Sequence, residues 1–526
     1  MKIRLLAPAE LQHALHDGKE IALLDVREDG EFGEDHLLFA TPLPYSRFEL
    51  GIGPLVPRKN VRIVLCDDGA SGIAQRAAAR LAAIGYTDLS VLDGGTRSWK
   101  AAGYPLFKGV NVPSKLFGEL VEHAYNTPRI TAQDLVKMRE AGEDFALFDG
   151  RPVHEHHKMT IPGSTCCPNA ELPYRIASMV KNPTTRIIVN CAGRTRSILG
   201  AQTLINFGVP NPVYALENGT QGWYLSDLQL EYGSARQYPD QVDAAALPMQ
   251  QQAAQELIKR FGVRTAAASE VAGWLNDESR TTYLCDVRTP EEFAAGSIPG
   301  AQHTPGGQLI QATDQWVGVR NARIVLIDGG EMVRAPVVAS WLLQLGCDAC
   351  VLEGGVTAKL AARPPEMPAL PDLQTVSAAE LRAMLEKKSC TAFDVGPSMA
   401  YRKAHVAESR WSIRTRIAKD AKGVQTPIVL IGDADIARLA ATELLDAGIR
   451  DLRYFEGGAA AWEHAGLATA ATPDSPADRD CIDYLFFVHD RHAGNREAMK
   501  QYLAWETGLM AQLGEQDKAV FRLPVH

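Results

Sequence analysis

With 526 residues, 46% hydrophobic and 22% charged, and a net charge of −9, the chain has the composition of a globular protein of several domains. No cluster of Lys or Arg stands out and no apolar run approaches the roughly 18 residues of a membrane span, so we expect neither nucleic acid nor membrane as a partner. Residues 1–15 lack a secretory signal pattern, and the nine cysteines follow no regular spacing, which together predict a cytoplasmic protein with free thiols.

The same order of predicted elements recurs four times along the chain. Each copy contains a helical pattern and an apolar strand that ends in Asp, at residues 22–25, 146–149, 283–286 and 391–394. A second apolar strand follows, at residues 62–65, 186–189, 323–327 and 428–431. A short polar loop and an amphipathic helix come next, and the helix stops at a glycine, namely Gly85, Gly208, Gly346 or Gly448. Because strands alternate with helices, we expect an α/β fold with mostly parallel sheets flanked by helices.

These copies divide the chain into four α/β domains and a tail. We place domains 1 to 4 at residues 1–110, 111–250, 251–371 and 372–472. The tail, residues 473–526, does not match the repeat. Residues 484–488 predict an apolar strand or docking segment and residues 493–513 a helix, so we expect an α/β tail that clamps the domains together. A homodimer contact through the tail is an open alternative.

The third copy carries the most informative motif. Asp-Val-Arg at 286–288, Glu-Glu-Phe at 291–293 and Gly-Ser-Ile-Pro-Gly-Ala at 296–301 resemble the signature of the rhodanese-like family. Residues 149–151 and 161–164 repeat this pattern in the second copy, and the first and fourth copies hold reduced versions. The resemblance covers about residues 1–470. It implies four tandem rhodanese-like domains and the activity of a sulfurtransferase, such as a thiosulfate sulfurtransferase.

The family places its catalytic Cys at the end of the second apolar strand, where the loop before the amphipathic helix begins. In the four copies we align Cys66, Cys191, Asp328 and, approximately, Gly432 with that position. The resemblance therefore implies that Cys191 is the catalytic residue. A buried, inert thiol is the alternative interpretation of Cys191.

The loop that begins at Cys191 has the residue types that a reactive thiol needs. It leads into a helix N-terminus, where backbone N–H groups and the helix dipole stabilise a thiolate. Gly193 permits a tight turn, and Arg194 and Arg196 supply positive charge for a dianionic donor such as thiosulfate. We predict that the substrate is bound by Ala192, Gly193, Arg194, Thr195, Arg196 and Ser197, with Arg175 as a further candidate for steering the donor.

The resemblance implies a two-step exchange that needs no cofactor and no metal. Cys191 takes the outer sulfur of thiosulfate or another sulfane-sulfur donor and passes it from a persulfide to cyanide or a thiol acceptor. A 3-mercaptopyruvate sulfurtransferase and a non-catalytic scaffold are alternatives. A rhodanese-like phosphatase is disfavoured, because that chemistry needs an Arg where this loop has Ser197.

Three other cysteines are candidates for a role in sulfur transfer. Cys66 is a candidate second site, although the neighbouring Asp67 and Asp68 disfavour a thiolate and repel anionic donors. Cys166 and Cys167 are candidates for a resolving thiol, with ordinary packing as the favoured interpretation. The histidines at 154, 156 and 157 predict a solvated face rather than a metal site.

Overall fold

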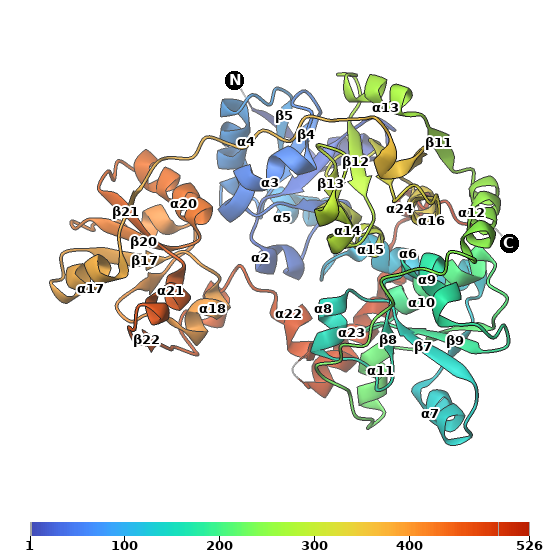
Figure 1. Ribbon diagram of the computed structural model, residues 1–526. Coiled ribbons are helices and arrows are strands. Elements are labelled where there is room, and N and C mark those ends of the chain that lie inside the picture. Colours follow the sequence, from blue (N-terminus) through green and yellow to red (C-terminus); the bar gives the residue numbers. More distant parts are fainter. Residues whose placement is uncertain (1–2, 493, 525–526) are drawn as a thin grey trace.

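The computed structural model describes residues 3–492 and 494–524. Each domain contains a five-stranded sheet, and the four sheets have the same strand order with parallel pairing (Figure 1). The first sheet comprises β1 (Arg4–Leu6), β2 (Ala22–Asp25), β3 (Thr41–Pro42), β4 (Ile63–Cys66) and β5 (Leu89–Leu92). The second comprises β6 (Arg129–Ile130), β7 (Phe145–Asp149), β8 (Thr165–Cys166), β9 (Arg186–Asn190) and β10 (Val213–Leu216). The predicted α/β fold with four repeated units is confirmed.

The third and fourth sheets repeat this order. The third comprises β11 (Arg264–Ala266), β12 (Thr282–Asp286), β13 (Gln302–His303), β14 (Arg323–Ile327) and β15 (Asp348–Leu352). The fourth comprises β16 (Gln374–Thr375), β17 (Thr391–Asp394), β19 (Arg410–Trp411), β20 (Ile428–Gly432) and β21 (Leu452–Glu456). Strands β18 (His405–Val406) and β22 (Thr469–Ala470) form a small antiparallel pair beside it. The central strands are apolar throughout because helices cover both faces of each sheet.

Helices surround each sheet. Domain 1 has α1 (Pro8–Leu15), α2 (Asp29–Glu34), α3 (Phe48–Leu55), α4 (Ile73–Ala83) and α5 (Gly95–Ala101). Domain 2 has α6 (Val112–Tyr125), α7 (Ala132–Glu140), α8 (Val153–Lys158), α9 (Leu172–Met179), α10 (Thr195–Phe207) and α11 (Gly219–Leu225). Domain 3 has α13 (Ala268–Leu275), α14 (Pro290–Ala295), α15 (Gly306–Gln311) and α16 (Arg334–Gln344). Domain 4 has α17 (Ala378–Glu386), α18 (Ser398–Lys403), α19 (Ile417–Asp420), α20 (Ala434–Asp446) and α21 (Gly458–His464). Helix α12 (Leu247–Phe261) spans the predicted boundary at residue 250.

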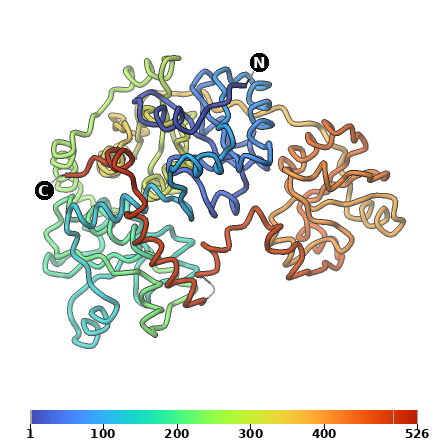
Figure 2. Tube along the Cα trace, turned by 180° about the vertical axis from the view of Figure 1, so that it is seen from behind, coloured from blue at the N-terminus to red at the C-terminus, as the bar shows by residue number. Residues whose placement is uncertain are grey.

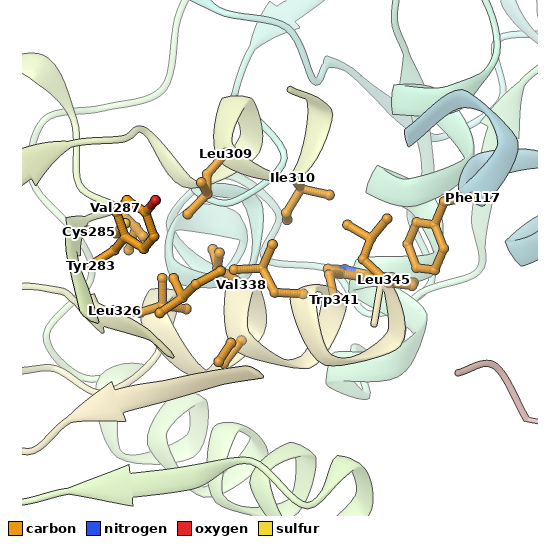
Figure 3. Packing of buried hydrophobic residues seen from close by; sticks show 14 of the residues in the cluster. Phe117, Tyr283, Cys285, Val287, Leu309, Ile310, Leu326, Val338, Trp341 and Leu345 are labelled. Carbon is orange, nitrogen blue, oxygen red and sulfur yellow. The ribbon is translucent and has the colours of Figure 1, made fainter. Parts of the chain in front are cut away.

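One continuous apolar core runs through domains 1 to 3. Figure 3 shows part of it, where Phe117 of α6 lies against Trp341 of α16 with ring centroids 5.8 Å apart. The indole Nε1 of Trp341 donates a hydrogen bond to Thr203 Oγ1 on α10 (2.8 Å). Helix α10, which directly follows the Cys191 loop, is therefore held in place by packing against a neighbouring domain.

Domain 4 lies to one side of the other three domains and has its own core (Figure 1). A buried ionic cluster joins it to domain 1. The side chain of Arg414 is 0% exposed, and its guanidinium donates to Glu49 of domain 1 (2.7 Å) and to Glu443 of domain 4 (3.2 Å). Burying a guanidinium requires such paired carboxylates, so this contact orients domain 4 specifically.

The tail crosses all four domains (Figure 2). Asp483 accepts from Ser398 N of domain 4, and Ile482 O accepts from Gly30 N of domain 1. Further along the tail lie α22 (Phe486–His489), α23 (Arg496–Gly508), which packs on α11 of domain 2, and α24 (Glu515–Lys518). Arg522 N then donates to Gln344 O of domain 3 (2.7 Å).

Two details of the predicted tail differ from the structure. Of the two alternatives for 484–488, the strand is wrong, because this segment enters the short helix α22. The docking segment fits, since Leu485 is 5% exposed and lies against Gly33 of domain 1, and Phe487 packs on Trp505 of α23. The helix predicted over 493–513 is present as α23, which begins at Arg496; residue 493 lies outside the described residues.

Candidate active site

The loop that begins at Cys191 connects the last residue of β9 to the first residue of α10. Its backbone is fixed by the turn that precedes α11: Thr220 N donates to Cys191 O (2.8 Å) and Gln221 N donates to Ala192 O (3.1 Å). The turn contains Gly219 with a φ of 51°, and a Cβ at that residue would lie 2.2 Å from Cys191 O. Only glycine fits this close approach, so the turn sets the loop's shape.

The thiol of Cys191 is sheltered and hydrogen-bonded. The residue is 2% exposed, and Ser197 Oγ donates to Cys191 Sγ (3.2 Å) from the first turn of α10. Helix α10 has 13 residues and starts four residues after the cysteine. The sulfur therefore lies close to the N-terminal end of this helix and within reach of a hydroxyl donor.

The two arginines of the loop are paired with carboxylates. Arg194 donates to both oxygens of Glu119 on α6 (2.7 and 2.9 Å). Arg196 donates to both oxygens of Glu155 on α8 (2.7 and 2.8 Å). Burial by itself would raise the pKa of Glu155, but Arg196 outweighs it and lowers this pKa to about 2. The sequence predicts two cations that face the donor, whereas the structure uses both to hold the loop against neighbouring helices.

The tail helix α23 covers the loop with a buried carboxylate. Glu506 is 1% exposed, and its Oε1 accepts from Thr195 Oγ1 (2.9 Å) and from Lys115 Nζ (3.2 Å). Its Oε2 lies 3.0 Å from the place that a Cβ on Gly193 would take. Burial would raise the pKa of Glu506, but Lys115 and Thr195 lower it, so the carboxylate is ionised. Glycine at 193 therefore suits the close approach of the tail, whereas its φ lies outside the left-handed region, so the turn itself does not require glycine.

Comparison with known proteins identifies the repeated unit. The family model of the rhodanese-like domain matches residues 7–102, 131–226, 267–362 and 377–465. The chain belongs to the rhodanese-like family. The structure of the thiosulfate sulfurtransferase from Pseudomonas aeruginosa resembles it with a TM-score of 0.92 and 40% identity, over 99% of this chain and 100% of that chain. An uncharacterized protein of Synechocystis is 31% identical over 115 residues, which span 22% of this chain and 62% of that protein.

The register of the rhodanese-like sheets corrects the alignment of Cys66. In domains 1 to 3 the residues opposite the strand-ending Asp are Cys66, Asn190 and Ile327. The position of Cys191 therefore belongs to Asp67 and Asp328, and both accept the matching bond, from Thr96 N and Val356 N (2.9 Å each). Cys66 is the last residue of β4 and lies one position before the residue equivalent to Cys191. Its side chain therefore points to the opposite face of the sheet. Burial raises the pKa of its thiol well above the usual value, and Asp25 adds to the effect.

In domains 1 and 3 a carboxylate occupies the position of Cys191 and accepts bonds from the loop amides. Asp67 accepts from Gly69 N (2.7 Å) and Ala74 N (3.1 Å). Asp328 accepts from Gly330 N (3.0 Å), Val333 N (3.2 Å) and Ala335 N (3.3 Å). In domains 1 and 3 the loop thus directs N–H groups at the carboxylate held at this position; both loops are two residues longer than the loop of Cys191.

Arg175 lies in the structure outside the loop. It is 3% exposed, donates to Glu171 (2.7 Å) and Pro239 O (2.7 Å), and stacks on Tyr238 at 4.3 Å. These contacts hold residues 238–239, which follow α11, against α9. Arg175 therefore has a structural environment rather than one that faces an incoming donor.

Cys166 and Cys167 are both 0% exposed, and burial raises the pKa of each thiol above its usual value. The thiol of Cys166 donates to Arg151 O (3.4 Å). Both residues are thus held in the thiol form, which suits the packing interpretation.

The predicted solvated face is confirmed for His154 and His157, which are exposed. It is wrong for His156, which is 1% exposed and lies between Asp149 Oδ2 (3.3 Å) and Ser234 Oγ (3.2 Å). In the part of the chain that the structure describes, no three His, Cys, Asp or Glu residues are grouped as metal ligands. None of the described helices is both long and apolar enough to cross a lipid bilayer.

Sequence reasoning missed Glu506, Lys115 and Glu119 as neighbours of the loop. The hydrogen bond from Thr195 to Glu506 joins residues 311 positions apart. No local motif marks such a partner. On α23 the buried residues Met499, Tyr502 and Glu506 recur at helical spacing. This spacing is the pattern by which the sequence could have indicated a buried face of the helix.

Proposed function

We propose that this rhodanese-like protein is a thiosulfate sulfurtransferase whose persulfide forms on Cys191. The observation that carries the proposal is the equivalence of Cys191 with Asp67 and Asp328. Those two carboxylates accept loop N–H groups at the same position, so the loop is built to stabilise a negative charge there. Cys191 is the residue of these three that is also a nucleophile.

The proposed reaction has two balanced steps. The Cys191 thiolate attacks the outer sulfur of thiosulfate, the sulfur–sulfur bond of thiosulfate breaks, and sulfite leaves with the bonding electron pair. Cys191 then carries a persulfide anion, which the loop amides and Ser197 Oγ stabilise. Cyanide or a thiolate attacks the outer sulfur and leaves as thiocyanate or a new persulfide, and the Cys191 thiolate returns.

The choice of thiosulfate as donor rests on the relative from Pseudomonas aeruginosa that bears this name, at 40% identity over 99% of the chain. Arg194 and Arg196 are both paired with carboxylates. Less positive charge is therefore available to neutralise the two negative charges of thiosulfate. This observation keeps 3-mercaptopyruvate, a monoanionic donor, as the second candidate. The nine free cysteines suit a cytoplasmic enzyme, which we propose as its location.

The test is a comparison of wild type with Cys191→Ser. Each protein is incubated with thiosulfate and cyanide, thiocyanate is measured, and intact mass spectrometry without cyanide reports an added sulfur atom. We expect thiocyanate and the adduct in the wild type and neither in Cys191→Ser. A parallel series with 3-mercaptopyruvate separates the two donors. Turnover retained by Cys191→Ser, or no turnover of wild type with either donor, would overturn the proposal.

A further inference from the structure

A second candidate site lies in a cavity where domain 1, domain 3, α6 and the tail meet. Its volume is about 110 Å³, and no residue of 191–197 lines it. The walls are mostly apolar, with Phe39 from domain 1, Val317 and Val319 from domain 3, and Phe521 from the tail. A cavity of about 150 Å³ holds benzene, so this one suits a molecule of about four to six non-hydrogen atoms.

One cation in the lining of this cavity has no counter-ion. The guanidinium of Arg320 stacks on the ring of Phe39 at 3.7 Å, and its Nε has no hydrogen-bond partner among the described residues. No ion pair joins Arg320 to any residue that the structure describes; Asp517 of the tail, which acts on it from a distance, is bonded to His16 (3.1 Å). Burial lowers the pKa of Arg320 to about 10, which is the expected sign for an uncompensated cation.

One carboxylate in the same lining is also without an ionic partner. Asp314 lies in the turn of 3-10 helix that follows α15, and the groups that stabilise its charge are the amides of residues 314 and 315. Burial raises its pKa to about 6, so it is mostly ionised at neutral pH. Within the described residues it forms no ion pair. Both Asp314 and Arg320 are half-buried, whereas the buried guanidiniums of Arg151, Arg288, Arg334 and Arg414 are all paired with carboxylates.

Polar groups with unused hydrogen-bonding capacity complete the lining. Gln311 is 8% exposed, and its Oε1 has no partner among the described residues; the same holds for Oδ1 of Asn111. Asn111, Pro113 and Ser114 bring the first turn of the 14-residue helix α6 to the cavity wall. The positive end of that helix favours a carboxylate nearby.

We propose that this cavity binds a small amino acid as a zwitterion. Arg320 and the N-terminal end of α6 take its carboxylate, and Asp314 takes its ammonium group, which also donates to the unpartnered amide oxygens of Gln311 and Asn111. Glycine, alanine and β-alanine have the size that the cavity accommodates. A ligand with both charges compensates Arg320 and Asp314 together, which neither a simple acid nor a simple amine does.

The test is calorimetric titration of the full-length protein with glycine, L-alanine and β-alanine. Propionate and ethylamine, which each lack one of the two charges, serve as ligand controls. We expect saturable binding of at least one amino acid and at least tenfold weaker binding of both controls, because each charged hydrogen bond is worth about a factor of ten or more.

Two variants test the assigned residues. Arg320→Gln and Asp314→Asn are each expected to weaken amino-acid binding at least about tenfold. Arg264→Gln, which removes an exposed arginine paired with Glu270 in the same domain, is the matched control and should bind as wild type does. No saturable binding to wild type, equal binding of propionate, or unchanged affinity in both variants would overturn the proposal. The ligand controls decide it on wild type even if a variant fails to fold.

Discussion

Domains 2 and 3 place a loop at the same point of the same sheet, but the helix begins four residues after Cys191 in domain 2 and six residues after Asp328 in domain 3. In domain 3 the carboxylate of Asp328 accepts three loop amides and satisfies the loop internally. In domain 2 the equivalent residue is Cys191, whose sulfur is hydrogen-bonded by Ser197, and a carboxylate from the tail covers the loop instead. The comparison shows that the longer loop of domain 3 closes on its own carboxylate, whereas the shorter loop of domain 2 leaves this position to a cysteine and receives a carboxylate from the tail.

The largest expected effect comes from making domain 2 resemble domain 3. We expect Cys191→Asp to lower thiocyanate formation at least about 10³-fold, because the nucleophile is lost. We also expect it to keep the melting temperature of Cys191→Ser or exceed it, since the loop amides can bond the new carboxylate. Assay and thermal melting are run on both variants. If Cys191→Asp unfolds while Cys191→Ser stays folded, the expectation that loop N–H groups bond a carboxylate at this position would be contradicted.

The second prediction concerns the removal of the carboxylate from the loop of domain 3. Asp328→Ala removes the acceptor of three buried N–H groups, so we expect the local opening free energy to fall by about 2 kcal/mol. Hydrogen exchange of residues 329–336 measures it. Cys191→Ala is the control and should change exchange in its own loop by less than about 1 kcal/mol. Equal protection in Asp328→Ala and wild type would show that the carboxylate does not hold the loop.

A smaller effect tests the tail's carboxylate as a neighbour of the reactive loop. Glu506→Gln removes a negative charge beside Thr195 and Gly193, which favours the thiolate of Cys191. We expect the pH midpoint of Cys191 alkylation to fall by about half a unit. Lys115→Met removes the opposing positive charge and should move the midpoint upward. Shifts of the same sign in both variants would contradict the electrostatic explanation.

The smallest effect is expected at Cys66. Because this residue ends its strand on the other face and its thiol is held protonated by burial, Cys66→Ser should keep turnover within about twofold of wild type. The thiosulfate–cyanide assay measures it beside Cys191→Ser. A loss comparable to that of Cys191→Ser would mean that domain 1 takes part in the transfer.

Much of the fold could be predicted because its signals are local. The four apolar strands that end in Asp, the glycines that stop the helices and the Asp-x-Arg motif each depend on a few neighbouring residues, as in the bonds from Arg288 to Asp286. The loop from Cys191 to Ser197 was found for the same reason. For residues 484–488 the sequence left a strand or a docking segment open, because the periodicity of a short apolar run does not distinguish helix from strand.

The sequence by itself determined four α/β repeats and the two loops, at Cys66 and Cys191, in which a cysteine precedes a helix N-terminus. Only the tertiary structure decided three other features. The sheet register moved Cys66 off the position of Cys191, since a shift of one residue turns a side chain to the opposite face. Packing between helices paired Arg194 and Arg196 with Glu119 and Glu155. The tail brought Glu506 to the loop from 311 residues away, a contact that depends on how domains pack and that no local pattern records.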